Sequence, residues 1–114
     1  MLAEVQAIVG DDIEIEIVHR DVGLESSTSG RLVDAVKQTL QRHDPGAPVF
    51  PYLLSGGTDN KALSRLGIAG YGFAPLRLPE GLDFPAMFHG VDERVPLDAL
   101  VFGRQVLRDL LLEY

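Results

Sequence analysis

The sequence predicts an α/β fold organised around one βαβ unit. Two short apolar runs, residues 49–54 and 68–74, have the length of buried strands. A helical pattern lies between them, from about Asp59 to Leu66. A strand, a helix and a second strand of these lengths predict a parallel pair with a right-handed crossover.

The first 20 residues predict a short helix and a half-buried strand. Isoleucine and glutamate alternate within residues 13–18, which is typical of a strand with a charged outer face. His19 and Arg20 follow and are interpreted as solvated linker residues. The preceding helix ends at Gly10. Its apolar face consists of Leu2, Val5, Ile8 and Val9.

Residues 21–30 are rich in Gly, Ser and Thr, so they predict a linker. An amphipathic helix is expected from about Ser29 to His43, and residues 44–46 end it because they contain Pro45. We expect His43 to interact with the negative end of this helix. The apolar stripe of the helix consists of Leu32, Val33, Val36 and Leu40.

Glycine and proline refine the βαβ unit. Pro51 within the first apolar run predicts an edge position or a bulge. Gly67 is placed to end the intervening helix. Gly70 and Gly72 interrupt the second run and predict a close approach of another backbone. Residues 75–88, with three prolines and little periodicity, predict a packed loop.

The last helix is expected to open at Val95–Pro96, with Pro96 near its first position. The acidic residues Asp92, Glu93 and Asp98 favour its positive end. One broad apolar face predicts that this helix belongs to the core. That face consists of Ala99, Leu100, Gly103, Val106, Leu107, Leu110 and Leu111.

Composition limits the classes of function. The 114 residues suit one small domain, and 46% apolar content argues against disorder. The net charge of −7 argues against partners such as nucleic acid or an anionic membrane. Cysteine is absent, which excludes thiolate metal sites. We expect a cytoplasmic protein, since neither a signal peptide nor a long apolar run is visible.

Two stretches carry candidate chemistry. The turn at Ser55–Asp59 follows an expected strand and begins an expected helix, where backbone N–H groups attract anions. The alternative is an ordinary turn with Thr58 or Asp59 as N-cap. His89 has two carboxylates and an arginine within five residues, so it could bind a metal or transfer a proton. The alternative is a polar loop residue before a capped helix, because a single histidine makes no metal site.

The order of three motifs resembles the C-terminal part of the M20 family of metallohydrolases. The motifs are the GGTD turn within residues 55–60, the YGFAP segment at 71–75 and the HGVDERV segment at 89–95. They are similar to those of the carboxypeptidase S-like or acylase-like branch, and the resemblance covers most of residues 13–114. The family's HxDxxP segment and Glu-Glu pair are not in this sequence.

The resemblance implies half of a zinc-exopeptidase-type catalytic domain in residues 21–114. Residues 1–20 would be the tail of an inserted lid domain, through which many relatives form homodimers. His89 would bind one zinc of a two-zinc centre, and Gly56, Gly57 and Thr58 would contact the substrate. Asp92 and Glu93 would either orient the zinc ligand from behind or cap the helix that follows.

The implied reaction is hydrolysis of an amide bond in a dipeptide or an N-acyl amino acid. The two zinc ions would polarise the amide carbonyl and lower the pKa of a water molecule. The remaining ligands and a glutamate base would come from the missing N-terminal half of the catalytic domain, so this chain alone should not catalyse. The alternative is a stand-alone, non-catalytic α/β module that binds a protein or a small ligand.

Overall fold

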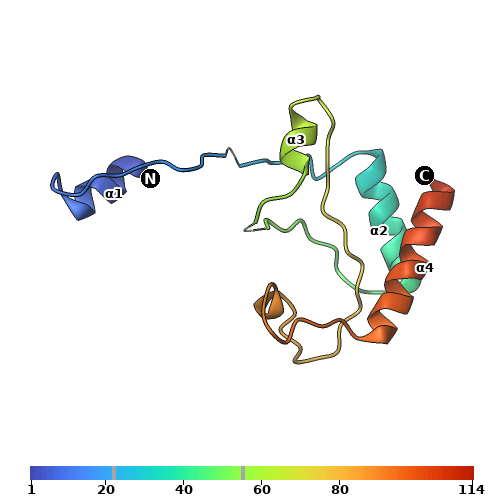
Figure 1. Cartoon of the computed structure of the whole chain (residues 1–114). Coiled ribbons are helices and arrows are strands. Elements are labelled where there is room, and N and C mark those ends of the chain that lie inside the picture. The colour runs from blue at the N-terminus through green and yellow to red at the C-terminus, as the bar shows by residue number, and fades with distance from the viewer. Residues whose placement is uncertain (22, 55) are drawn as a thin grey trace.

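The computed structural model describes residues 1–21, 23–54 and 56–114. Val22 and Ser55, which belong to the predicted linker and the predicted turn, lie outside the described residues. Figure 1 shows helical elements joined by long connections. In chain order they are α1 (Leu2–Val9), α2 (Arg31–His43), α3 (Asn60–Ser64), the 3₁₀ turn η1 (Pro85–Met87) and α4 (Leu97–Glu113).

The predicted α/β fold is wrong, because no β-strand forms within the described residues. Residues 49–54 and 68–74 run as irregular traces between the helices (Figure 1). No backbone hydrogen bond joins these two runs. An apolar run favours an extended chain, but a strand also needs a neighbour that offers aligned N–H and C=O groups. Pro51 further removes one donor. The βαβ half of a zinc-exopeptidase-type domain is therefore absent from this part of the chain.

Of the helix and the strand predicted in residues 1–20, only the helix forms. Helix α1 forms as predicted and ends at Gly10, whose φ is 80°. Residues 13–18 form no strand, since no other described segment pairs with them. No residue of α1 is buried, and Figure 1 shows this helix at the far end of an arm. The predicted apolar face of α1 therefore has no packing partner among the described residues.

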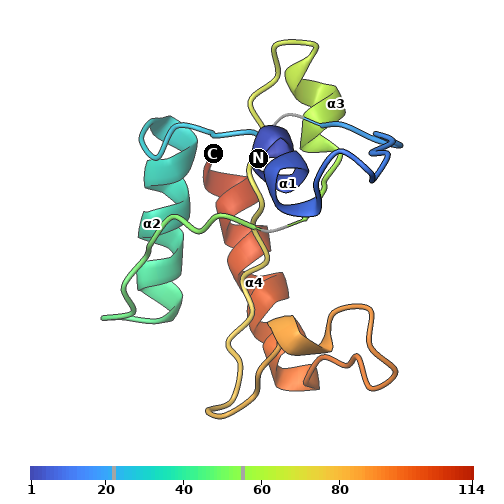
Figure 2. The ribbon, with the colours of Figure 1, turned by 90° about the vertical axis from the view of Figure 1, so that its left-hand side faces the viewer.

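The core lies between α2 and α4, which run side by side in both views (Figures 1 and 2). Ala99 and Val106 are completely buried, and Leu110 is 6% exposed. Thr39 of α2 is 2% exposed, and its hydroxyl accepts a hydrogen bond from Arg42. The predicted stripe of Leu32, Val33, Val36 and Leu40 is only half-buried, and the fully buried residue of α2, Thr39, was not part of it. The helix ends at His43 as expected.

Polar pairs hold the same two helices at the edge of this core. His43 Nε2 lies 2.8 Å from Asp109 Oδ2, and its ring meets Phe102 edge-on with 6.2 Å between ring centroids. Arg42 also pairs with Glu113. His43 thus joins α2 to α4 through a side chain, a role that the helix-end interpretation did not include.

Gly103 lets Pro75 and Leu76 pack directly on α4. A Cβ atom at this position would lie 2.7 Å from the carbonyl oxygen of Pro75, which is closer than real Cβ atoms come to other atoms. Pro75 is itself buried there. The middle of α4 therefore needs a residue without a side chain.

The predictions for the other glycines are only partly correct. Gly67 has a φ of 75° and follows the short helix α3, as expected. Gly70 is closely approached, because a Cβ atom there would lie 2.2 Å from Oδ1 of Asn60. The approaching group is a side chain and not a backbone. The prediction fails for Gly72, which has open space around it.

Four of the seven residues of the predicted apolar face of α4 are buried. The residues buried by α2 and by Pro75 are Ala99, Gly103, Val106 and Leu110. Leu100 and Leu107 remain 49% and 39% exposed, and Leu111 is 77% exposed. The helix begins at Leu97 with Pro96 as its N-cap residue, one position later than predicted. The prediction that α4 belongs to the core is confirmed for one side of the helix.

The molecule is extended for its length. Its radius of gyration is 18.8 Å, and its principal extents are 58 × 36 × 22 Å. A compact domain of this size has a radius of gyration of about 13 Å. The excess reflects the α1 arm and the long connections that stand away from the α2–α4 pair (Figures 1 and 2).

Candidate functional site

His89 lies on a tight exposed turn between η1 and α4. Its φ is 60°, which makes it the one non-glycine residue with positive φ among those that the structure describes. The backbone N–H of His89 donates to Oε2 of Glu93 at 3.1 Å. The N–H of Gly90 donates to the carbonyl of Met87 at 2.9 Å. These two hydrogen bonds hold the backbone of His89 in a left-handed conformation, which is uncommon outside glycine but which histidine adopts more often than most other residues.

The acidic residues near His89 have two different roles: Glu93 holds the turn, and Asp98 lies at the start of α4. Glu93 bonds the amide of His89 rather than capping α4, because α4 has no side-chain cap. Asp98 does lie in the first turn of α4, where a carboxylate favours the positive end of the helix. Arg94 donates to the carbonyl of Asp92 at 2.9 Å and so closes the loop between them. The sequence did not reveal that Glu93 fixes the conformation of His89.

His89 is exposed, and no hydrogen bond of its ring is found within the described chain. No group of three or more His, Asp or Glu side chains that could hold a metal ion occurs among residues 1–21, 23–54 and 56–114. Zinc in proteins is usually held by at least three protein ligands. The described residues therefore offer His89 as a single candidate ligand and no complete coordination sphere.

The predicted substrate turn lies elsewhere. Gly57 and Thr58 line an open cavity of about 370 Å³ next to α3, while Gly56 is exposed and is not among the residues that line it. His89 does not line this cavity either. The remaining lining residues are Asp21, Asp59, Lys61, Ala62 and Arg65. The structure therefore brings two of the three predicted substrate contacts together, without the predicted metal ligand.

Helix α3 provides a weaker anion site than the sequence indicated. The predicted helix runs to Leu66, but α3 contains five residues and ends at Ser64. Asp59 occupies the N-cap position, as the ordinary-turn alternative predicted, but its side chain makes no cap hydrogen bond. The carbonyl of Thr58 accepts from the N–H of Lys61 at 3.1 Å. Few aligned peptide dipoles point at the turn, so the helix contributes little attraction for an anion.

Lys61 and Asp21 join the linker to α3 at this cavity. The ammonium of Lys61 donates to Oδ2 of Asp21 at 3.1 Å, and Nε2 of His19 lies 3.0 Å from the same oxygen. Hydrogen bonds from His19 first and from Lys61 second hold the pKa of Asp21 below its usual value. His19 is 79% exposed, in keeping with its interpretation as a solvated residue, but its contact with Asp21 was not predicted. Lys61 and Asp21 are 40 residues apart, so no local pattern reports their contact.

We predict that acid releases this contact. The pKa of Asp21 is lowered in the folded protein, so its contact with His19 and Lys61 stabilises the fold fully above the ordinary Asp pKa of about 3.9. This stabilisation is lost as the pH falls through the lower pKa of the folded state. Lys61→Gln should move the pKa of Asp21 back toward its ordinary value. The measurement is the NMR titration of the Asp21 carboxyl carbon. An unchanged titration curve in Lys61→Gln would contradict the contact, and Lys37→Gln serves as the control.

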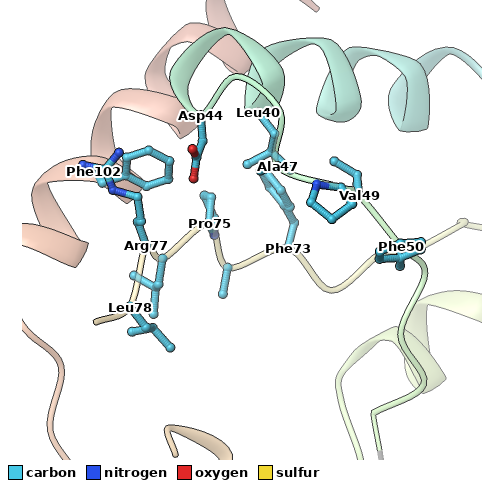
Figure 3. A pocket seen from close by; sticks show the side chains of 13 residues that line it. Leu40, Asp44, Ala47, Val49, Phe50, Phe73, Pro75, Arg77, Leu78 and Phe102 are labelled. Carbon is cyan, nitrogen blue, oxygen red and sulfur yellow. The ribbon is translucent and has the colours of Figure 1, made fainter. Parts of the chain in front are cut away.

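A second cavity lies between α2, α4 and the two apolar runs (Figure 3). Its volume is about 410 Å³. The guanidinium of Arg77 covers one end and lies 5.2 Å from the ring centroid of Phe102. The apolar side chains that line the cavity include Leu40, Val49, Phe50, Phe73, Leu76 and Leu78. Sequence reasoning assigned both runs to strands and so did not predict an open space between them.

The comparisons with known proteins give no family for this chain. No family model, curated protein or solved structure matches it. No helix within the described residues is long and apolar enough to cross a membrane.

Proposed function

We propose that this chain is the C-terminal part of a metal-dependent hydrolase that cleaves an amide bond of a dipeptide or an N-acyl amino acid. The motif order supports this function, since GGTD, YGFAP and HGVDERV occur in the order typical of M20 enzymes. The overall fold gives no support, because the described residues contain no sheet.

The turn at His89 is the observation that carries this function. A non-glycine residue in the left-handed region is strained by about 1 kcal/mol or more and persists where its surroundings hold it. Here the carboxylate of Glu93 and the Met87–Gly90 hydrogen bond hold it. The result is an exposed imidazole on a constrained backbone, which suits a metal ligand.

The metal would be zinc, with His89 as one ligand and the others supplied by polypeptide outside these 114 residues. Neutral imidazole is a common zinc ligand, and the ring of His89 is accessible. Bound zinc supplies Lewis acidity toward the amide carbonyl. The contribution of this chain is to present His89, while Glu93 keeps its backbone in place.

The substrate would approach the turn at Gly56, Gly57 and Thr58. Two cationic side chains, Lys61 and Arg65, line the cavity beside Gly57 and Thr58. Arg65 favours the free carboxylate of a dipeptide or an N-acyl amino acid, whereas Lys61 is paired with Asp21. Residues 1–20 would belong to a lid and dimerisation domain, residues 21–114 would belong to the catalytic domain, and the protein would be cytoplasmic.

Removal of the metal tests this function. In the complete polypeptide, EDTA should reduce hydrolysis of dipeptides and N-acetyl amino acids by roughly tenfold or more, because the Lewis acid is lost. Added zinc should restore the rate. The measurement is release of free amino acid, together with zinc content by mass spectrometry. Hydrolysis that resists complete zinc removal would contradict a metal-dependent mechanism.

The second candidate is a non-catalytic module that binds another polypeptide. The apolar side chains of Phe50, Tyr52 and Leu53, which are 77%, 78% and 80% exposed, favour it, because exposed apolar residues close together mark interaction sites. A complete polypeptide that binds no zinc and hydrolyses neither substrate class would support this candidate over the hydrolase.

A further inference from the structure

Helix α4 carries a second apolar seam on its exposed side, at the outer edge of the molecule (Figure 1). Along this seam the residues follow one another at alternating intervals of three and four positions, which keeps them on one face of the helix. Its leucines are between 39% and 78% exposed. We call it the outer seam of α4, and it consists of Leu97, Leu100, Arg104, Leu107 and Leu111.

The spacing of the outer seam indicates that its occupant is a helix. Alternation of three and four positions is the pattern by which one helix packs along another. The buried side of α4 has the same alternation at Ala99, Gly103, Val106 and Leu110, and α2 runs along α4. At 1.5 Å per residue, the outer seam spans about 21 Å, which accommodates a partner helix of about four turns.

The charged side chains on the exposed side of α4 are basic. Arg104 lies within the outer seam, and Arg108 lies one turn further along beside it. Both residues are exposed, and neither belongs to an ion pair among residues 1–21, 23–54 and 56–114. A partner that covers the seam removes water from Arg104, and this is costly unless a carboxylate takes the place of the water.

The acidic side chains of α4 lie on the other side of the helix. Asp109 pairs with His43 and Glu113 pairs with Arg42, so both carboxylates face α2. Asp98 shares their side, because it lies three helical turns before Asp109. Within α4, which the structure describes in full, no carboxylate neutralises the outer seam. The seam therefore favours an acidic partner.

Charge and length argue against the other occupants. A second copy that docked through its own outer seam would bring Arg104 and Arg108 close to the same residues of its partner, and like charges in an interface are costly. Helix α1, of the same chain or of a second copy, has eight residues and spans about 12 Å, so it covers little more than half of the seam. The net charge of −7 disfavours an anionic membrane surface.

We propose that the outer seam of α4 binds an acidic amphipathic helix of a polypeptide outside these 114 residues. The partner helix lies along α4, covers the leucines of the seam, and places Asp or Glu where it meets Arg104 and Arg108. The interaction goes beyond the hydrolase function, because it requires neither zinc nor substrate. It stands whether or not His89 is a metal ligand.

Two peptides of matched sequence test this preference. Each has three heptads with Leu at positions a and d, except that the central a position and every e and g position carry Glu in one peptide and Lys in the other. The readout is fluorescence anisotropy of the labelled peptide during titration with the 114-residue chain, without metal. The Glu peptide should bind at least tenfold more tightly, because its charges complement Arg104 and Arg108.

The two peptides also separate local from overall charge. The net charge of −7 by itself attracts the Lys peptide, so a preference for the Glu peptide must come from a basic surface. Equal affinities, a preference for the Lys peptide, or no binding of the Glu peptide would overturn the proposal.

A charge-reversal variant locates the basic part of the surface. Arg104→Glu should lower the affinity for the Glu peptide at least tenfold and raise the affinity for the Lys peptide, because the seam then repels the first and attracts the second. Arg20→Glu is the control, since it makes the same change of charge at an exposed residue before the linker. It should change either affinity by less than twofold. Equal effects of both variants would contradict docking on α4.

A second pair of variants tests the apolar part of the seam. Leu111→Gln changes a side chain that is 77% exposed, so the fold should tolerate it while affinity for the Glu peptide falls at least tenfold. Leu66→Gln changes a side chain that is 75% exposed beyond α3 and should leave the affinity unchanged. Unchanged affinity in Leu111→Gln would overturn the proposal.

Sedimentation and vesicle binding test the other occupants directly. Dimerisation of the chain that Leu111→Gln abolishes would make a second copy the occupant and would overturn the proposal. Binding to vesicles of anionic phospholipid that Arg104→Glu abolishes would make the seam a membrane surface and would overturn it too. A chain that stays monomeric, ignores such vesicles and binds the Glu peptide would support an acidic helix as the partner.

Discussion

Replacement of His89 by Asn in the complete polypeptide should lower amide hydrolysis by about a hundredfold or more and reduce zinc content. Loss of groups that only orient a ligand already lowers metal affinity or activity by roughly 10–100-fold, so loss of the ligand itself should exceed this. Asn is the informative substitution because it tolerates positive φ well. The turn that Glu93 holds should therefore persist while the imidazole is removed. Hydrolysis rates and zinc content are the two measurements.

His43→Gln is the matched control for this variant. His43 is also a histidine near an element end, but it pairs with Asp109 between α2 and α4. Its replacement should lower stability slightly and leave zinc content unchanged. Wild-type zinc content and activity in His89→Asn would exclude His89 as a ligand, and parallel losses in both variants would point to a general folding defect.

Gly103→Val should destabilise the α2–α4 core by about 2–3 kcal/mol, because overpacking a closely packed site typically costs 1–3 kcal/mol. The new Cβ atom would lie 2.7 Å from the carbonyl oxygen of Pro75, a backbone atom that cannot rotate away. Pro75 and Leu76 would have to move away from the helix. The gain in helix propensity from removing glycine offsets only part of this effect. Urea unfolding followed by the circular dichroism of the helices measures the change.

Gly72→Val is the control, because a Cβ atom at Gly72 meets nothing within 4 Å. Its unfolding free energy should stay within about 0.5 kcal/mol of the wild-type value. Equal stability of Gly103→Val and Gly72→Val would contradict the direct packing of Pro75 on α4. A loss in Gly103→Val alone would support it.

The helices could be predicted because their signal is local. Apolar residues three and four positions apart on α2 and α4 define one face whatever lies elsewhere in the chain. The positive φ of Gly10 and Gly67 follows equally from nearby sequence. The exposed half of the α4 face, with Leu111 at 77%, could not be predicted, because periodicity does not report how much partner surface is available.

The strands failed because pairing is not local. Residues 49–54 and 68–74 have the composition of buried strands, yet each needs a neighbour in register, and composition does not say whether one is present. The sequence pointed to His89 but not to its left-handed backbone, because that depends on Glu93 four residues away. No local pattern could likewise predict the contact between Lys61 and Asp21, because the two residues are 40 positions apart.

The separation of α2 and α4 along the chain sets how the protein tolerates insertions. Their contact closes a connection that runs from His43 to Leu97. The entropy of closing such a loop grows slowly, so doubling its length costs only about 0.6 kcal/mol. Truncating Val106 to Ala would remove buried methyl groups and cost more than this. Length variation among natural variants should therefore accumulate in the connection, whereas the buried face of α4 should stay constant in size.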